Sequence, residues 1–241
     1  MMRLCAIALV AAAVSACADE GGEVLLVLRN QAPGENCLIS ASESDPFTPA
    51  GILDTAAALA GRGYLLTPLV KNISTTATAT EAQRTIIAHG ANVDLRFADQ
   101  QKFGDDINGF EQAGLTRFQV PFSGAVSPNG GTASFSFEVI PAQLIAAIQP
   151  KLAAFERTVI LADVVIFGDM SGGRVESQTF TYPVDVCNGC LVNTIGDCAM
   201  VPQSFEPRPG GACNPFQDAV VDCCTSGGGN ILVCPAQGTG T

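Results

Sequence analysis

The distribution of cysteine constrains the fold of this chain more than any other feature of its sequence. Seven of the ten cysteines lie in the segment 187–241, which is otherwise rich in Gly, Pro and Asn and poor in periodic apolar residues. Such a segment can bury little apolar surface, so covalent links must supply much of its stability. We therefore expect residues 187–241 to form a disulfide-rich, loop-dominated C-terminal tail.

The first 16 residues predict that the chain is exported. A short cationic start is followed by an apolar run over residues 4–16. As a helix this run would extend about 20 Å, which is short of the roughly 30 Å hydrocarbon core of a bilayer. Residues 1–16 therefore predict a cleaved signal peptide rather than a membrane span, and no later stretch is apolar for long enough to cross a membrane as a helix.

The apolar run ends in Val14-Ser15-Ala16-Cys17, a motif that resembles the lipobox of bacterial lipoproteins. The resemblance implies that diacylglycerol is attached to the Cys17 sulfur, that the chain is cut before this residue, and that the protein is anchored to a membrane through it. Residues 17–22 would then be the lipidated cysteine and a short linker. Because Ala18 rather than Asp follows Cys17, the resemblance implies the outer membrane rather than the inner one. An ordinary A-x-A signal peptidase site at residues 16–18 is the alternative.

Eight cysteines remain when Cys5 leaves with the signal peptide and Cys17 carries lipid. An even number in an exported chain is typical of a disulfide framework, although the sequence leaves the pairing open. Cys37 is alone near the front of the chain, so it can pair only with the tail or with another molecule. The disulfide candidates are Cys37, Cys187, Cys190, Cys198, Cys213, Cys223, Cys224 and Cys234.

Cys187 and Cys190 have the C-x-x-C spacing, which is compatible with two alternatives to a structural disulfide. Two thiolates at this spacing can bind one zinc ion, but no second C-x-x-C follows and the only histidine is about a hundred residues away. A redox-active pair would need the motif at the start of a helix. Here a strand-like run leads into Cys187, and Asn188-Gly189 is typical of a turn, so we favour a disulfide.

Strand-like runs separated by turn residues dominate residues 23–186. The clearest predicted hairpin joins residues 118–126 to 132–140 through a turn that contains Asn-Gly. A second predicted hairpin joins residues 159–167 to 175–186 through Ser-Gly-Gly. Short strands with almost no long helix predict an all-β fold, and the pattern resembles an antiparallel, immunoglobulin-like β-sandwich followed by the tail.

Only two segments compete for helix. Residues 141–148 place Pro141 at a suitable first position and apolar residues at helical spacing, so we expect a helix there. Residues 54–60 are rich in alanine but are followed by Gly61, which predicts either one helical turn or a strand.

One acidic segment, residues 104–111, is a candidate calcium site. Its oxygen-bearing side chains lie around two glycines, and calcium prefers six to eight hard oxygen ligands. The spacing does not match an EF-hand, so a solvated loop is the simpler interpretation. The candidate ligands are Asp105, Asp106, Asn108 and Glu111.

Composition and motifs argue against several classes of function. Twelve basic and 23 acidic residues give a net charge of −11, which disfavours binding to nucleic acid. The only histidine, His89, ends an apolar strand-like run, so we interpret it as a packing or surface residue rather than a catalytic base. No G-x-S-x-G or P-loop motif is present, so we expect no catalytic residue, no cofactor and no nucleotide.

The lipobox, together with residues 183–190 leading into the tail, resembles cell-envelope lipoproteins of Gram-negative bacteria that have Cys-rich C-termini. The resemblance implies a location in the cell envelope rather than an activity. We expect a non-enzymatic binding, adhesion or scaffolding role, with the membrane as one partner through Cys17 and an envelope protein or glycan as another. The alternatives are an envelope hydrolase that uses acidic side chains and an assembly partner that acts by strand addition.

Overall fold

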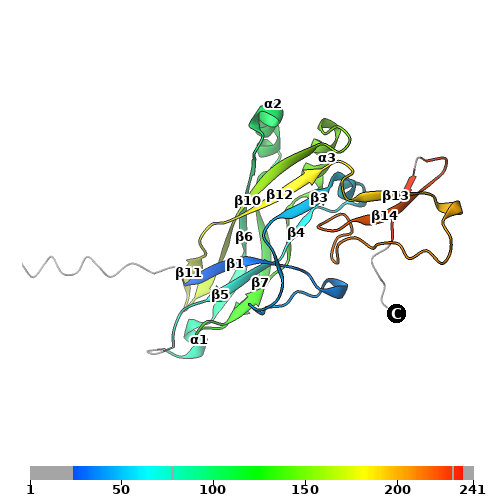
Figure 1. The fold of residues 1–241 in the computed structure, drawn as a ribbon. Helices are drawn as coiled ribbons and strands as arrows, with labels where there is room; N and C mark the ends of the chain where they lie inside the picture. Colours follow the sequence, from blue (N-terminus) through cyan, green and yellow to red (C-terminus); the bar gives the residue numbers. More distant parts are fainter. Residues whose placement is uncertain (1–23, 77–78, 230, 236–241) are drawn as a thin grey trace, which may run out of the picture.

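A computed structural model describes residues 24–76, 79–229 and 231–235 of the chain (Figure 1). The predicted signal peptide, residues 1–16, and the predicted lipidated cysteine and linker, residues 17–22, lie outside the described residues. Strands dominate the described part and helices are few, which confirms the prediction of an all-β protein. Within these ranges no helix is both long and apolar enough to span a membrane.

The strands fall into several sheets, and their bounds follow in chain order. They are β1 (Leu25–Gln31), β2 (Phe47–Thr48), β3 (Gly51–Asp54), β4 (Tyr64–Leu66), β5 (Pro68–Asn72), β6 (Ile86–Phe97), β7 (Arg117–Val126), β8 (Thr132–Ser134), β9 (Phe137–Ile140), β10 (Arg157–Met170), β11 (Gly173–Glu176), β12 (Phe180–Cys187), β13 (Val192–Asp197), β14 (Val221–Ser226) and β15 (Ile231–Val233). The α-helices are α1 (Glu81–Arg84), α2 (Gln100–Gln112) and α3 (Ala142–Ile148). Four short 3₁₀ helices cover Glu35–Cys37, Thr55–Ala60, Gln149–Lys151 and Cys198–Met200 in the described residues.

The largest sheet has the order β3-β12-β10-β6-β7, with β11 also paired to β10 (Figure 1). All of its pairs are antiparallel except β12 with β3. Along β10 the burial alternates, because successive side chains of a strand point to opposite faces. One face therefore joins the core, and the other, which we call the outer face, carries residues such as Asp163 and Asp169.

A second sheet, β2-β1-β5-β8, and the short pair β4-β9 supply the other side of the core. Buried side chains from these sheets, from the inner face of the largest sheet and from α3 form one hydrophobic cluster. Fully buried members include Leu25, Tyr64, Leu66, Val70, Ile86, Ile140, Leu144, Ile160, Val164 and Val184.

The strand prediction is right in one hairpin and wrong in the other. Strand β10 turns through Ser171 and Gly172, which have positive φ, and pairs with β11 and β12 as predicted. The strands over 118–126 and 132–140 are not ladder partners in the described structure. The Asn129-Gly130 turn exists, but its backbone donates to Ser74 and Asn72. Consequently β8 pairs with β5 and β9 pairs with β4, while β7 pairs with β6.

The helix prediction is confirmed for residues 141–148, where Pro141 precedes α3. Residues 55–60 form a 3₁₀ helix, and Asp54 at its start accepts a hydrogen bond from the backbone N–H of Ala56. Of the two predicted outcomes, a helical turn or a strand, the structure has the helical turn. It forms because an Asp side chain can accept a hydrogen bond from a free N–H at the start of a helix.

Residues 104–111, interpreted as a solvated loop, are instead part of helix α2, so the loop interpretation is wrong, while calcium binding by this segment stays a prediction. Phe103, Ile107 and Phe110 have helical spacing and pack on the core, while Asp99 accepts a hydrogen bond from the Lys102 backbone. These contacts outweigh the two glycines. Successive helical side chains are about 100° apart, so Asp106 is turned away from Asp105, Asn108 and Glu111. One of them, Asp106, forms an ion pair with Lys151 at 2.6 Å.

Residues beyond 186 contact the part of the chain that precedes them. Strands β13, β14 and β15 form a small sheet of their own, beside the larger sheets in Figure 1. Phe216 joins the main hydrophobic cluster, and Gln217 forms an antiparallel bridge with Leu53 on the free edge of β3. The domain boundary at residue 186 stays a prediction. The contacts of Phe216 and Gln217 connect the residues after this boundary to those before it.

Candidate functional site

All eight cysteines in the described residues are paired in disulfides, which fits the prediction of disulfide bonds. Cys37 near the front of the chain is bonded to Cys213, at a separation of 176 residues. The other pairs are Cys187–Cys190, Cys198–Cys224 and Cys223–Cys234, with separations of 3, 26 and 11 residues.

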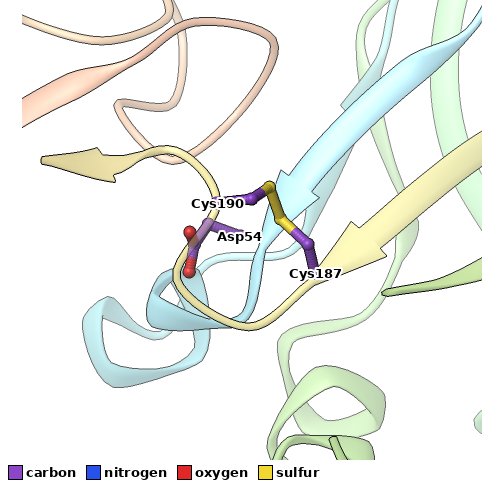
Figure 2. A group of neighbouring side chains, drawn as sticks. All are labelled: Asp54, Cys187 and Cys190. Carbon is purple, nitrogen blue, oxygen red and sulfur yellow. A yellow bond between two sulfur atoms is a disulfide. The ribbon is translucent and has the colours of Figure 1, made fainter. Parts of the chain in front are cut away.

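Asp54 lies beside the C-x-x-C pair, and its carboxylate and the two sulfurs are within 4.8 Å of one another (Figure 2). It is the last residue of β3 and the parallel partner of Cys187 in β12. Its side chain is fully buried and accepts hydrogen bonds from the backbone N–H groups of Gly189 at 3.2 Å and Leu191 at 2.8 Å. The carboxylate therefore fixes the shape of the loop that carries the two cysteines.

The geometry of this cluster favours structure over chemistry. A zinc site needs both sulfurs as thiolates, whereas Cys187 and Cys190 are bonded to each other. Exchange with other thiols also proceeds through a thiolate, and a carboxylate at this distance disfavours a second negative charge. Sequence reasoning missed Asp54, although an Asp before Thr55 and a run of alanines is a signal for a helix start.

A second buried polar cluster joins the tail to β4 and β12. The hydroxyl groups of Tyr64 and Tyr182 are 3.1 Å apart, and the Tyr64 hydroxyl donates to Asp218 at 2.9 Å. Desolvation raises the pKa of both tyrosines and of the Asp218 carboxyl, although hydrogen bonds from Ile52 and Gln217 oppose the rise for Asp218. A pocket of about 250 Å³ borders this cluster, and Asp218 is the only acidic residue among those described in its lining.

The outer face of the largest sheet carries a third cluster, at the centre of strands β12, β10, β6 and β7. Cross-strand register places Thr181, Asp163, Asp94 and Arg117 in one row across these strands. The next row on one side holds Val165, Asn92 and Gln119. Between these rows lies a hollow of about 480 Å³, whose lining includes Asn92, Asp94, Arg117, Asp163, Val165 and Thr179. We call it the outer-face hollow.

Asp94 and Asp163 are directly opposite each other on neighbouring strands, and each is matched by an arginine. Arg117 donates to Asp94 through Nε at 3.0 Å and Nη2 at 2.7 Å. Arg96 donates to Asp163 through Nε at 2.7 Å and Nη2 at 3.1 Å. The hydrogen bond from Arg96 is the main cause that lowers the pKa of Asp163, with a further contribution from Thr181.

Two facing carboxylates are also the arrangement that an envelope hydrolase, the alternative function predicted from the sequence, would use. Acid catalysis requires one of them to keep its proton near neutral pH, which needs a raised pKa. The lowered pKa of Asp163 has the opposite sign, so this carboxylate stays ionised. Asp163 is therefore suited to accepting hydrogen bonds rather than to donating a proton.

His89 lies on the outer face, away from these clusters. Its Nε2 is 2.9 Å from Oδ2 of Asp169, and about half of each side chain is exposed, 46% for His89 and 52% for Asp169. No second histidine exists in the sequence to share a metal with it. This geometry agrees with the interpretation of His89 as a surface residue.

Comparison with known proteins gives no relative for this chain. No protein-family model matches it, and neither a curated protein nor a solved structure does. Its function is therefore inferred from its own residues and their geometry.

Proposed function

We propose that this chain is an exported lipoprotein, anchored to the outer membrane through Cys17, with a non-enzymatic binding, adhesion or scaffolding role. In this proposal residues 23–186 are an immunoglobulin-like sandwich and residues 187–241 a disulfide-rich tail. The observation that carries the proposal is the pairing of all eight described cysteines. Disulfides of this number persist in oxidising compartments and are rare in the reducing cytosol.

The outer-face hollow supports a binding role. Its lining combines two carboxylates, one guanidinium group and an amide on regular strands, and a second guanidinium group, that of Arg96, holds the Asp163 carboxyl ionised. Polar groups fixed on regular strands are well placed to recognise a partner. An envelope protein or an envelope glycan is the expected partner besides the membrane.

The test of anchoring uses Cys17→Ala, with Cys5→Ala as the matched control. Cys5 lies in the predicted signal peptide and is lost on cleavage, so its replacement should change nothing. We expect the wild type and Cys5→Ala to incorporate radiolabelled palmitate and to sediment with membranes. Cys17→Ala should lose the label and enter the soluble exported fraction. A Cys17→Ala protein that still carries fatty acid would refute the proposed anchor.

A second candidate function, assembly by strand addition, is favoured by strand β7. This strand has 10 residues, and in the described sheets it pairs only with β6. An unpaired edge of this length can accept a strand from another chain, although Pro121 has no backbone N–H to donate to it. A photocrosslinker at Ser123 on β7 should trap a specific envelope protein if this function operates, and the same group at Arg174 on β11 is the control.

A further inference from the structure

We infer that the outer-face hollow binds an uncharged oligosaccharide. This inference rests on the proposed binding function and names the class of ligand for it. The hollow has about 480 Å³, which is within the range of roughly 300–1,000 Å³ that is typical of small-ligand sites. Its polar side chains project from β10, β6 and β7, whose pairing is regular beside the hollow, where residues 92–94 of β6 face residues 163–165 of β10 and 117–119 of β7.

Charge matching within the hollow argues for a ligand without net charge. Asp94 is paired with Arg117, which also lines the hollow, and Asp163 is paired with Arg96, which lies beside the lining, so each carboxylate has a guanidinium partner. A cation would meet carboxylates that already have guanidinium partners. An anion would be repelled by the net charge of −11 carried by the whole chain.

The polar groups of the lining include both hydrogen-bond donors and acceptors. The carboxylates accept, the guanidinium group of Arg117 donates, and the amide of Asn92 does both. Asn92 is held by Gln119, whose Nε2 donates to its Oδ1 at 2.9 Å. A sugar ring presents adjacent hydroxyls that donate and accept together. The apolar side chain of Val165 between these groups gives its C–H face a contact surface.

The pair of facing aspartates is itself an observation that calls for a function. Like charges directly opposite each other destabilise an antiparallel pair. Here Arg117 and Arg96 offset the repulsion, so two arginines hold two carboxylates side by side, whereas a simple ion pair such as Arg157 with Asp185, at 2.6 Å, needs no such balance. A local departure from the favourable pattern is expected where a site, rather than stability, has determined the residues.

The side chains are accessible enough for a ligand to reach them. Asp94 is 43% exposed and Asp163 is 21% exposed, while Arg117 is 74% exposed at the rim. A bound sugar can therefore contact both carboxylates, and the long Arg117 side chain can close over it. The ion pairs hold the carboxylates in position before binding, which reduces the ordering that binding would otherwise cost.

The test is a glycan array of neutral and acidic oligosaccharides probed with the full-length protein in detergent, followed by calorimetry of the bound probe. We expect neutral oligosaccharides to bind and acidic ones to bind more weakly or not at all. Asp163→Asn should weaken binding about tenfold or more, because it removes a charged hydrogen-bond partner. The matched control is Asp169→Asn, which changes the same residue type on the same strand and face, beside His89 and outside the hollow.

Circular dichroism checks that each variant is folded, and Asn92→Ala provides a second variant if Asp163→Asn is not. The inference is overturned if no neutral oligosaccharide binds the wild type, if acidic ones bind better, or if Asp169→Asn weakens binding as much as Asp163→Asn. These outcomes leave palmitate labelling of Cys17 unaffected. Loss of that labelling with sugar binding intact would instead overturn only the proposed anchor.

Discussion

Replacing the Cys37–Cys213 disulfide should destabilise the protein far more than replacing Cys187–Cys190. The loop-closure model assigns about 5 kcal/mol to the bond with a separation of 176 residues and about 2 kcal/mol to the bond with a separation of 3. Each pair has one buried cysteine, Cys213 with 7% and Cys187 with 0% exposure, and one less buried partner, since Cys37 is exposed and Cys190 half-buried; serine therefore disturbs the packing of Cys213–Cys37 no more than that of Cys187–Cys190. The difference of about 3 kcal/mol then measures the restriction of the unfolded chain.

The assay compares Cys37→Ser/Cys213→Ser with Cys187→Ser/Cys190→Ser in urea unfolding. The chain has no tryptophan, so far-UV circular dichroism is the suitable signal. A loss of about 5 kcal/mol is comparable to the whole stability of many domains, so the first variant should be partly unfolded near physiological temperature. Its native contacts remain available, since Arg62 donates to the Cys213 carbonyl and Asn214 to the Gly63 carbonyl.

Equal losses in the two variants would refute this reasoning, as would a larger loss for Cys187→Ser/Cys190→Ser. The first result would mean that the unfolded chain keeps its two ends close without the disulfide. The second would mean that the short loop beside Asp54 carries more of the stability than loop closure predicts.

Two further predictions concern single carboxylates. Asp54→Ala should lower the free energy of unfolding by about 3 kcal/mol or more, because three backbone N–H groups lose their acceptor. The control, Asp197→Ala at the start of an exposed 3₁₀ helix, should cost about 1 kcal/mol. Urea unfolding measures both, and similar losses would contradict the structural role given to Asp54. Hydrogen bonds from Arg208 and Asn193 lower the pKa of Asp222, so its stabilisation is present above the ordinary value of about 4 and is lost as the pH falls below it. The free energy of unfolding of Asp222→Asn should therefore fall less than that of the wild type between pH 7 and pH 3. An equal fall in the two proteins would contradict this prediction.

The element types could be predicted from the sequence where local pattern and tertiary contacts agree. Pro141 with apolar residues at helical spacing gave α3, and the Ser-Gly-Gly turn gave the β10 hairpin. The Asn129-Gly130 turn was also correct locally. The predicted pairing of its two flanking strands is wrong, because backbone hydrogen bonds from the turn to Asn72 and Ser74 direct the strand that follows it into another sheet.

The candidate sites depend on register, which the sequence does not contain. Asp94 and Asp163 become neighbours only because β6 and β10 pair with one particular offset. Asp54 reaches Cys187 and Cys190 through the parallel pairing of β3 with β12, which joins distant parts of the chain. The acidic segment in α2 shows the reverse, since adjacent acids in the sequence diverge in space once Phe103 and Phe110 impose a helix.

The most direct test of the account is mass spectrometry of the mature protein, purified without reducing agent from the envelope of cells that express it. We expect a chain that begins at Cys17, carries diacylglycerol on that residue, and has no free thiol among its eight other cysteines. A mature chain that begins elsewhere without lipid would contradict the proposed anchor. Free thiols at Cys187 and Cys190 would contradict the assignment of this pair as a structural disulfide.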